Sequence, residues 1–127
     1  MTTAPVRGER RYARAVLAER ALRAPAFDGL APASLYLGGG TPSRWDPGEV
    51  AEVVAAVRAR FRFPERAEIT IEVNPESCDR GGLRALRAAG VNRVSVGVQS
   101  FDPGVLAKLG RRHGPDAAER AIRVAAE

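Results

Sequence analysis

Three short clusters of glycines or polar residues, each following an apolar stretch, carry the residue types of a ligand site. The first is Gly38-Gly39-Gly40-Thr41, the second contains Glu72 and the third contains Gln99. Consecutive glycines leave main-chain N–H groups open to a polar ligand, because no Cβ stands in the way. A carboxylate accepts hydrogen bonds from an ammonium group or from ribose hydroxyls, and an amide both donates and accepts. Together these groups could hold a small zwitterion with hydroxyl groups.

Each cluster also has a plainer interpretation. The glycine run could be a flexible turn, and Glu72 and Gln99 could be solvated strand residues. Arg111, in the run after Gly110, would ordinarily belong to a solvated loop. A phosphate-binding loop is disfavoured, because the glycine run lacks the P-loop lysine and leads into no immediate helix. The recurrence of polar clusters at corresponding places in successive units favours a shared site.

The patterns along the chain predict helices that alternate with strands. Asp46 and Asp79 are suitable helix N-caps, and Gly90 is a typical residue just past a helix end. Strict alternation of apolar and polar residues marks the later two strands. Helices are predicted at about Arg10–Ala24, from Asp46 to Pro64, from Asp79 to Gly90, from Pro103 to about Gly110 and at Pro115–Ala126, and strands at Ala31–Leu37, Glu68–Val73 and Val94–Val98.

The order of these elements predicts a parallel sheet, because one helix between successive strands requires right-handed crossovers. Strands of a doubly wound sheet are apolar on both faces. Here Thr70 and Glu72, and on the next strand Ser95, Gly97 and Gln99, give one face small and polar residues. Such a face suits the inside of a ligand-holding barrel. We therefore predict an α/β fold, an incomplete (β/α) barrel of about three parallel strands with outer helices, in a single partial domain spanning 1–127.

The overall composition is that of an ordinary soluble chain. It has 127 residues, of which 45% are hydrophobic and 28% charged, and no apolar run approaches the roughly 20 residues that span a bilayer. Met1–Pro5 lacks the apolar core of a secretory signal, so we expect a cytoplasmic location. The net charge of +5 comes almost entirely from arginines. Aromatic residues do not interleave with them, so nucleic-acid binding is not expected.

Cys78 is the only cysteine and His113 the only histidine. A single cysteine excludes an internal disulfide and a cysteine-based metal site within this chain. We expect both residues to be structural, although each could in principle ligate a heme iron.

Four blocks of sequence resemble a known family. They are Gly38–Ser43, Ile71–Pro75, Leu86–Phe101 and Leu109–His113, in this order and with matching spacing. The chain resembles the radical S-adenosylmethionine (SAM) proteins of the oxygen-independent coproporphyrinogen III oxidase family, and the later two blocks resemble its heme chaperone branch, HemW. The resemblance covers about Tyr12 to Glu127.

The resemblance implies a function in heme or porphyrin metabolism and a set of cofactor contacts. SAM would contact Gly39, Gly40, Thr41, Glu72, Gln99 and Arg111. The family holds a 4Fe–4S cluster through a CxxxCxxC motif, which has no match in these residues. We therefore expect a part of the domain without the first barrel strand, its cluster loop, the later strands and the carboxyl-terminal domain, and we expect the chain alone to be inactive.

Two further expectations complete the sequence interpretation. As an alternative, the chain could be a non-catalytic module that binds heme or docks to a partner that supplies the missing strands. A partial barrel would also leave sheet edges open, which favours association between chains.

Overall fold

The computed structural model describes residues 7–127, so Met1–Pro5, for which no signal sequence is predicted, lies outside the described residues. The chain alternates helices and strands in the predicted order, joined by 3-10 turns after the first helix and after the first two strands. The helices are α1 (Arg7–Arg23), α2 (Pro47–Arg60), α3 (Arg80–Ala88), α4 (Pro103–Lys108) and α5 (Pro115–Ala126), the strands are β1 (Ser34–Leu37), β2 (Glu68–Val73) and β3 (Arg93–Val96), and the 3-10 turns are η1 (Ala24–Phe27), η2 (Pro42–Arg44) and η3 (Pro75–Ser77).

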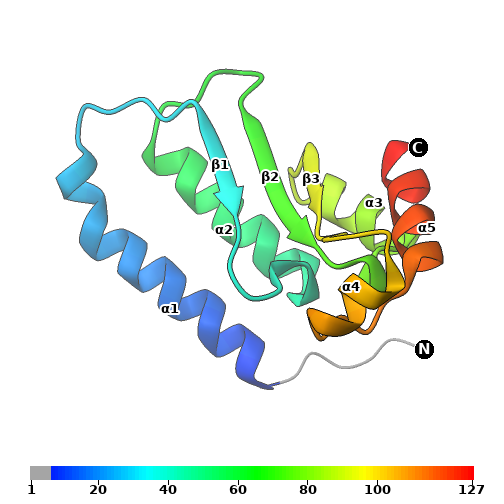
Figure 1. Cartoon of the computed structure of the whole chain (residues 1–127). Coiled ribbons are helices and arrows are strands. Elements are labelled where there is room, and N and C mark those ends of the chain that lie inside the picture. The colour runs from blue at the N-terminus through cyan, green and yellow to red at the C-terminus, as the bar shows by residue number, and fades with distance from the viewer. Residues whose placement is uncertain (1–6) are drawn as a thin grey trace.

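The three strands form one parallel sheet in the order β1-β2-β3 (Figure 1). Tyr36 lies opposite Thr70 on β2, and Glu72 lies opposite Ser95 on β3. The sheet is open, because β1 and β3 each pair with β2 alone among the described residues. The predicted α/β fold with three parallel strands and outer helices is therefore confirmed.

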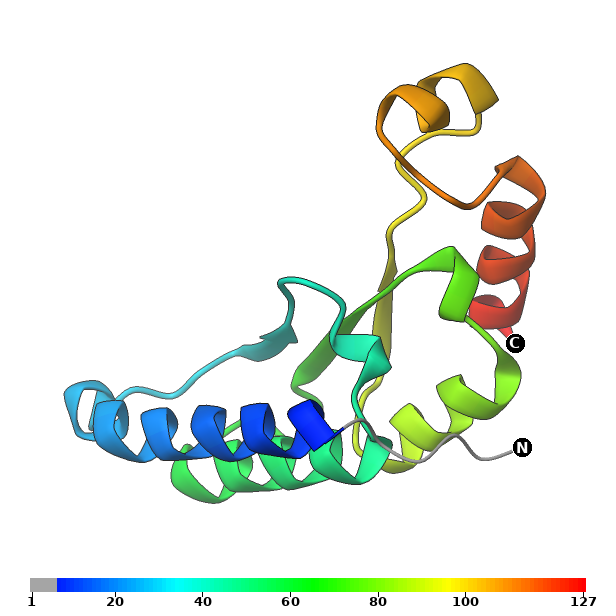
Figure 2. The ribbon, with the colours of Figure 1, turned by 90° about the horizontal axis from the view of Figure 1, so that it is seen from below.

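The two faces of the sheet differ as the alternation predicts. Ile69, Ile71 and Val73 on the central strand are all buried, and the first two belong to the main core cluster. α2 and α3 cover this face, while α1 lies along α2 (Figure 2). At about 1.5–3 kcal/mol for each buried aliphatic side chain, this face supplies a large part of the stability. The other members of the cluster are Val50 and Val54 from α2, and Leu86, Ala89 and Val91 from α3 and the turn after it.

Helices α2 and α3 begin directly after the aspartates that the sequence indicates, and α3 ends before its predicted glycine. The Asp46 carboxylate accepts a hydrogen bond from the Gly48 N–H, and the Asp79 carboxylate accepts one from the Gly82 N–H, each at 2.8 Å. Gly90 follows α3 with a φ of +99°, a conformation that favours glycine. These aspartates satisfy N–H groups that the first turn of a helix leaves without partners.

The boundaries of four elements were predicted wrongly. Helix α2 ends at Arg60 and not at Pro64, because Phe61 is already extended. The first helix begins at Arg7 and passes into a 3-10 turn that contains Pro25, because proline is tolerated in the first positions of a turn. The first strand starts at Ser34 and not at Ala31, since Pro32 donates no hydrogen bond to a ladder. The third strand is Arg93–Val96 and ends before Gly97.

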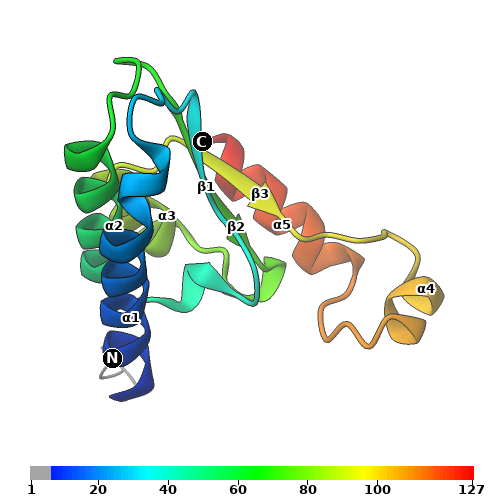
Figure 3. The ribbon, with the colours of Figure 1, turned by 90° about the vertical axis from the view of Figure 1, so that its left-hand side faces the viewer.

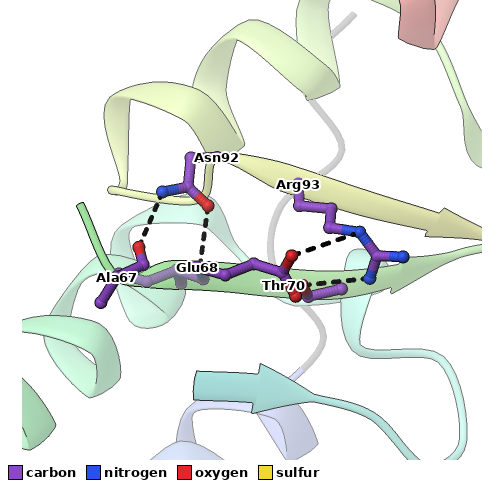
Figure 4. A network of polar contacts seen from close by, with 6 residues as sticks. Ala67, Glu68, Thr70, Asn92 and Arg93 are labelled. Carbon is purple, nitrogen blue, oxygen red and sulfur yellow. Dashed lines mark hydrogen bonds and ion pairs between the residues drawn. The ribbon is translucent and has the colours of Figure 1, made fainter. Parts of the chain in front are cut away.

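Two groups of polar contacts lie near the start of the strands (Figure 4). Thr70 is fully buried, and its hydroxyl donates to the Glu68 carboxylate at 2.9 Å. Arg93 Nε lies 3.6 Å from Glu68 Oε2, and Arg93 Nη1 donates to the Thr70 hydroxyl at 3.4 Å. Asn92 donates through Nδ2 to the Ala67 carbonyl at 2.9 Å and accepts from the Ile69 N–H at 2.8 Å. The Asn92 amide thus extends the β2–β3 ladder by one side chain.

We predict that Asn92→Ala lowers the free energy of unfolding by about 1–2 kcal/mol. The substitution removes two hydrogen bonds to the backbone at the start of β2, at Ala67 and Ile69, and each contributes about 0.5–1.5 kcal/mol net. Urea denaturation measures the loss. Arg84→Ala, on an exposed position of α3, is the control and should stay within about 0.5 kcal/mol of the parent chain. Equal stability of both variants would contradict the role given to Asn92.

We also predict that the chain associates through its open edges. Beside β1 lies an apolar groove of about 690 Å³ lined by Phe27, Leu30 and Phe63, among other residues, and an unpaired edge invites pairing with another chain. Ser34→Lys, on β1, should weaken association about two- to fivefold by placing like charges together at the interface. Analytical ultracentrifugation measures the effect.

Ala55→Lys is the matched control for this experiment. It adds the same charge at an exposed position of helix α2, outside the strands of the sheet. Equal weakening by both substitutions would mean that net charge governs association. A monomer at all concentrations would contradict the prediction outright.

Candidate functional site

The carboxyl ends of the strands meet around one pocket of about 360 Å³. Parallel α/β proteins bind ligands at this edge of the sheet, and the volume falls within the range of about 300–1,000 Å³ typical of ligand pockets. The pocket is lined by Gly40 and Thr41 after β1, Glu72, Val73 and Asn74 at the end of β2, Ser95 to Gln99 at the end of β3, and Arg111 after α4.

The backbone conformation explains two of the three consecutive glycines. Gly39 has a φ of +85° and Gly40 a φ of +64°, both in the left-handed region that other residues rarely adopt. This turn directs the Gly39 N–H toward β2, where it donates to Glu72 Oε2 at 3.0 Å. Gly40 and Thr41 then line the pocket itself.

Glu72 stands on the polar face at the end of the central strand and is half-buried. Its Oε1 accepts a hydrogen bond from the Tyr36 hydroxyl at 2.8 Å, while Oε2 accepts the bond from Gly39. A carboxylate has about four lone-pair positions. Glu72 can therefore accept further hydrogen bonds from a ligand without losing these two.

Gln99 reaches the pocket by a different route from the predicted one. The sequence places it on an inner face by continued strand alternation, but β3 ends at Val96. The Gly97 N–H still donates to the Val73 carbonyl at 2.9 Å, and Gln99 then turns into the left-handed region with a φ of +67°. A Cβ at Gly97 would lie 3.3 Å from Gln99 Nε2. Because Gly97 has no side chain, the Gln99 amide can lie beside the pocket.

Arg111 joins the pocket from outside the sheet. It follows Gly110, which ends α4 with a φ of +65°, and its N–H donates to the Leu106 carbonyl at 2.9 Å. Arg111 is exposed and lines the same pocket as Glu72. A site with both a cation and an anion complements a zwitterionic ligand.

His113 fixes the segment that follows α4 and carries Arg111. Helix α4 stands away from the other helices (Figure 3), yet His113 is only 6% exposed and its Nε2 lies 3.0 Å from the Val98 carbonyl oxygen. A carbonyl only accepts, so Nε2 carries the proton and donates. The bond joins the segment after α4 to the residue before Gln99, and so positions both Gln99 and Arg111.

Cys78 is also engaged within the fold. Its Sγ lies 3.6 Å from the Ala121 carbonyl oxygen of α5. Burial raises the pKa of the Cys78 thiol, and the neighbouring Asp79 carboxylate raises it further. The thiol form is a poor metal ligand. Within residues 7–127, no group of three or more histidine, cysteine, aspartate or glutamate side chains is arranged to hold a metal ion.

The sequence interpretation missed two contacts at this site: Tyr36 contacts Glu72, and Asn74 Nδ2 donates to the Thr41 hydroxyl at 3.3 Å. Ser95, which the alternation places on the polar face, lines the pocket. The alternation on β1 places Tyr36 on the polar face, which was the available signal. The partners of Asn74 follow only from the path of the loop after β1.

The chain as a whole matches the model of the Radical SAM superfamily, over residues 6–127. The chain belongs to this superfamily. It is 42% identical over 92 residues to the heme chaperone HemW of Escherichia coli, covering 72% of this chain and 24% of that protein. It is 39% identical over 115 residues to the oxygen-independent coproporphyrinogen III oxidase of Paracoccus denitrificans, covering 89% and 25%.

A mitochondrial relative and a solved structure agree with this placement. The mouse radical S-adenosyl methionine domain-containing protein 1, mitochondrial, is 46% identical over 94 residues, 74% of this chain and 21% of that protein. The structure of Escherichia coli coproporphyrinogen III oxidase (HemN), a radical SAM enzyme, superposes with a TM-score of 0.78 at 33% identity, over 94% of this chain and 27% of that one. The resemblance to the HemW and oxidase branch is thus confirmed.

Two further findings concern the length of the match and the helices of the chain. This radical SAM chain spans about a quarter of the length of the curated relatives that it matches. In the part of the chain that the structure describes, no helix is both long and apolar enough to cross a membrane.

We predict that His113→Ala destabilises the chain by about 1–3 kcal/mol, because it leaves the partly buried Val98 carbonyl without this donor. Urea denaturation measures this loss. Arg112→Ala, at the exposed neighbouring position, is the control and should change stability by less than about 0.5 kcal/mol. If His113 were instead a free ligand for heme iron, its replacement would leave the stability of the heme-free chain unchanged.

Proposed function

We propose that this chain forms part of the SAM site of a radical SAM protein that acts in heme or porphyrin metabolism. The observation that carries the proposal is the convergence of Glu72, Gln99 and Arg111 on one pocket beside Gly40 and Thr41. These residues come from three different strand ends and from the segment after α4, and the family resemblance assigns all of them to the cofactor. The names of the relatives, a heme chaperone and a coproporphyrinogen oxidase, support the metabolic assignment.

The chemistry of these residues fits SAM. The ligand carries an ammonium group, a sulfonium, a carboxylate, ribose hydroxyls and an adenine ring. Glu72 can accept from the ammonium or the hydroxyls, Arg111 can pair with an anionic group, and Gln99 can donate and accept. Gly40 brings bare backbone to the pocket, while Gly39 donates to Glu72 beside it. Gly97 leaves room where a Cβ would approach Gln99.

The iron–sulfur cluster of the family does not fit this chain. Three cysteine thiolates would be needed for the CxxxCxxC motif, and these 127 residues contain one cysteine, which lies after β2 with its thiol against α5. We therefore assign cofactor binding to these residues and no radical step. Bound SAM supplies the precursor of the radical in the complete enzymes of the superfamily.

The wider setting is a proposal in the same sense. We propose that the whole protein to which this chain corresponds binds heme or a porphyrin in addition to SAM. Residues 1–127 would form one partial domain of that protein. The cytoplasmic location stays a prediction, since one relative carries a mitochondrial name. No observation on His113 or Cys78 favours the alternative of a heme-ligating module, because both side chains are engaged within the fold.

We predict that Arg111→Ala weakens SAM binding about tenfold or more, because hydrogen bonds to charged groups contribute about 1.5–3 kcal/mol. Titration of the ¹⁵N-labelled chain with SAM, followed by amide chemical shifts, measures dissociation constants up to the millimolar range that an incomplete site would have. Arg112→Ala removes the same charge at the adjacent exposed position and should leave the affinity unchanged.

Three outcomes are informative. Saturable shifts that gather at Gly40, Thr41 and Gln99 would support the proposal. Equal weakening by the Arg111 and Arg112 substitutions would indicate that only net charge matters. The absence of saturable shifts in the parent chain would overturn the assignment of this pocket to SAM.

A further inference from the structure

Tyr36 touches the proposed cofactor site without lining its pocket. It lies on β1, opposite Thr70, with its side chain on the polar face and 54% exposed. Its hydroxyl donates to Glu72 Oε1 at 2.8 Å, although Glu72 is two residues further along the neighbouring strand. An aromatic side chain is long enough to reach such a diagonal neighbour. The exposed Tyr36 phenol therefore contacts a residue that lines the pocket.

Gly38 provides the space for this contact. Unlike Gly39 and Gly40, it does not have a positive φ, so backbone conformation does not account for a glycine here. A Cβ at Gly38 would lie 2.5 Å from Tyr36 Cε1 and 3.2 Å from Glu72 Cδ. The Tyr36 ring and the Glu72 carboxyl group therefore meet directly above the bare backbone of Gly38. Any larger residue would push the ring away from the carboxylate.

The Glu72 carboxylate is held at both oxygens. Tyr36 binds Oε1 and the Gly39 N–H binds Oε2 at 3.0 Å. A half-buried glutamate would otherwise sample several rotamers and lose that freedom when a ligand arrives. A carboxylate that is already oriented presents its remaining lone pairs in one direction.

We propose that Tyr36 is a positioning residue of the cofactor site, which orients the Glu72 carboxylate for the ligand, and that Gly38 is the glycine that makes this possible. The inference rests on the proposed SAM site. Each of the three consecutive glycines then has a separate role, since Gly38 admits the ring, Gly39 binds the carboxylate, and Gly40 lines the pocket.

The test removes only the phenol oxygen. We expect Tyr36→Phe to raise the SAM dissociation constant of the 127-residue chain about three- to tenfold, the size of one hydrogen bond. The amide shift of Gly39, which donates to the same carboxylate, should change in the ligand-free variant. Gly38→Ala should weaken binding in the same way, because it displaces the ring while the hydroxyl is retained.

A double-mutant cycle separates positioning from general support of the fold. If Tyr36 acts through the carboxylate, Tyr36→Phe has no further effect on SAM affinity in a Glu72→Ala background, which leaves the hydroxyl no side-chain acceptor at position 72. Tyr12→Phe is the matched control, because Tyr12 is 59% exposed, packs edge-on against Trp45 and lies outside the pocket lining. It should bind SAM like the parent chain.

The outcomes separate the two proposals. Unchanged affinity and an unchanged Gly39 shift in Tyr36→Phe, with saturable SAM binding by the parent chain, would overturn the role of Tyr36 alone. Additive effects of Tyr36→Phe and Glu72→Ala would also overturn it, since the phenol would then act independently of the carboxylate. A parent chain without saturable binding would overturn the SAM site itself and this inference with it.

Discussion

The alternation of β2 is the constraint on which both the core and the pocket depend. Its odd-numbered residues Ile69, Ile71 and Val73 enter the core under the helices, and the even-numbered Thr70 and Glu72 face the other way. Because side chains alternate with a period of two, a shift of one residue would expose the isoleucines and bury the glutamate. The buried face therefore fixes the register that carries Glu72 to the carboxyl end of the sheet. The core and the proposed ligand site are thus tied to the same six residues.

The register also fixes how the loops converge. Each strand ends at a polar or glycine-containing turn, and parallel pairing brings these turns to one edge. The turns are held by backbone bonds and left-handed residues, as at Gly39 and Gln99, because a loop that lines a ligand site cannot rely on an apolar core of its own. Arg111 comes from farther along the chain and depends on the bond between His113 and Val98. The pocket is thus assembled from segments that are distant in sequence and near in the sheet.

The elements that were predicted correctly have strong local signals. β2 was placed to the residue by its alternation, and α5 by its proline start. The errors fall where local signals are weak. The four-residue strands β1 and β3 carry too few alternations to mark their ends, and the path of Gln99 depends on a positive φ that is unusual for glutamine. The contacts of Tyr36 and Asn92 needed the register between strands, which no single stretch of sequence contains.

The grouping of polar side chains on one face of the sheet has a consequence for how the site is maintained. Near the start of the strands, Thr70, Glu68 and Arg93 bind one another, while at the far end Glu72 is bound by Tyr36 and Gly39. Polar residues on a sheet face cost stability unless they find partners. The first group satisfies itself within the fold. At the other end the Glu72 carboxylate keeps free lone pairs toward the pocket, so the part of the polar face that remains able to bind a ligand is the end where the strand turns converge.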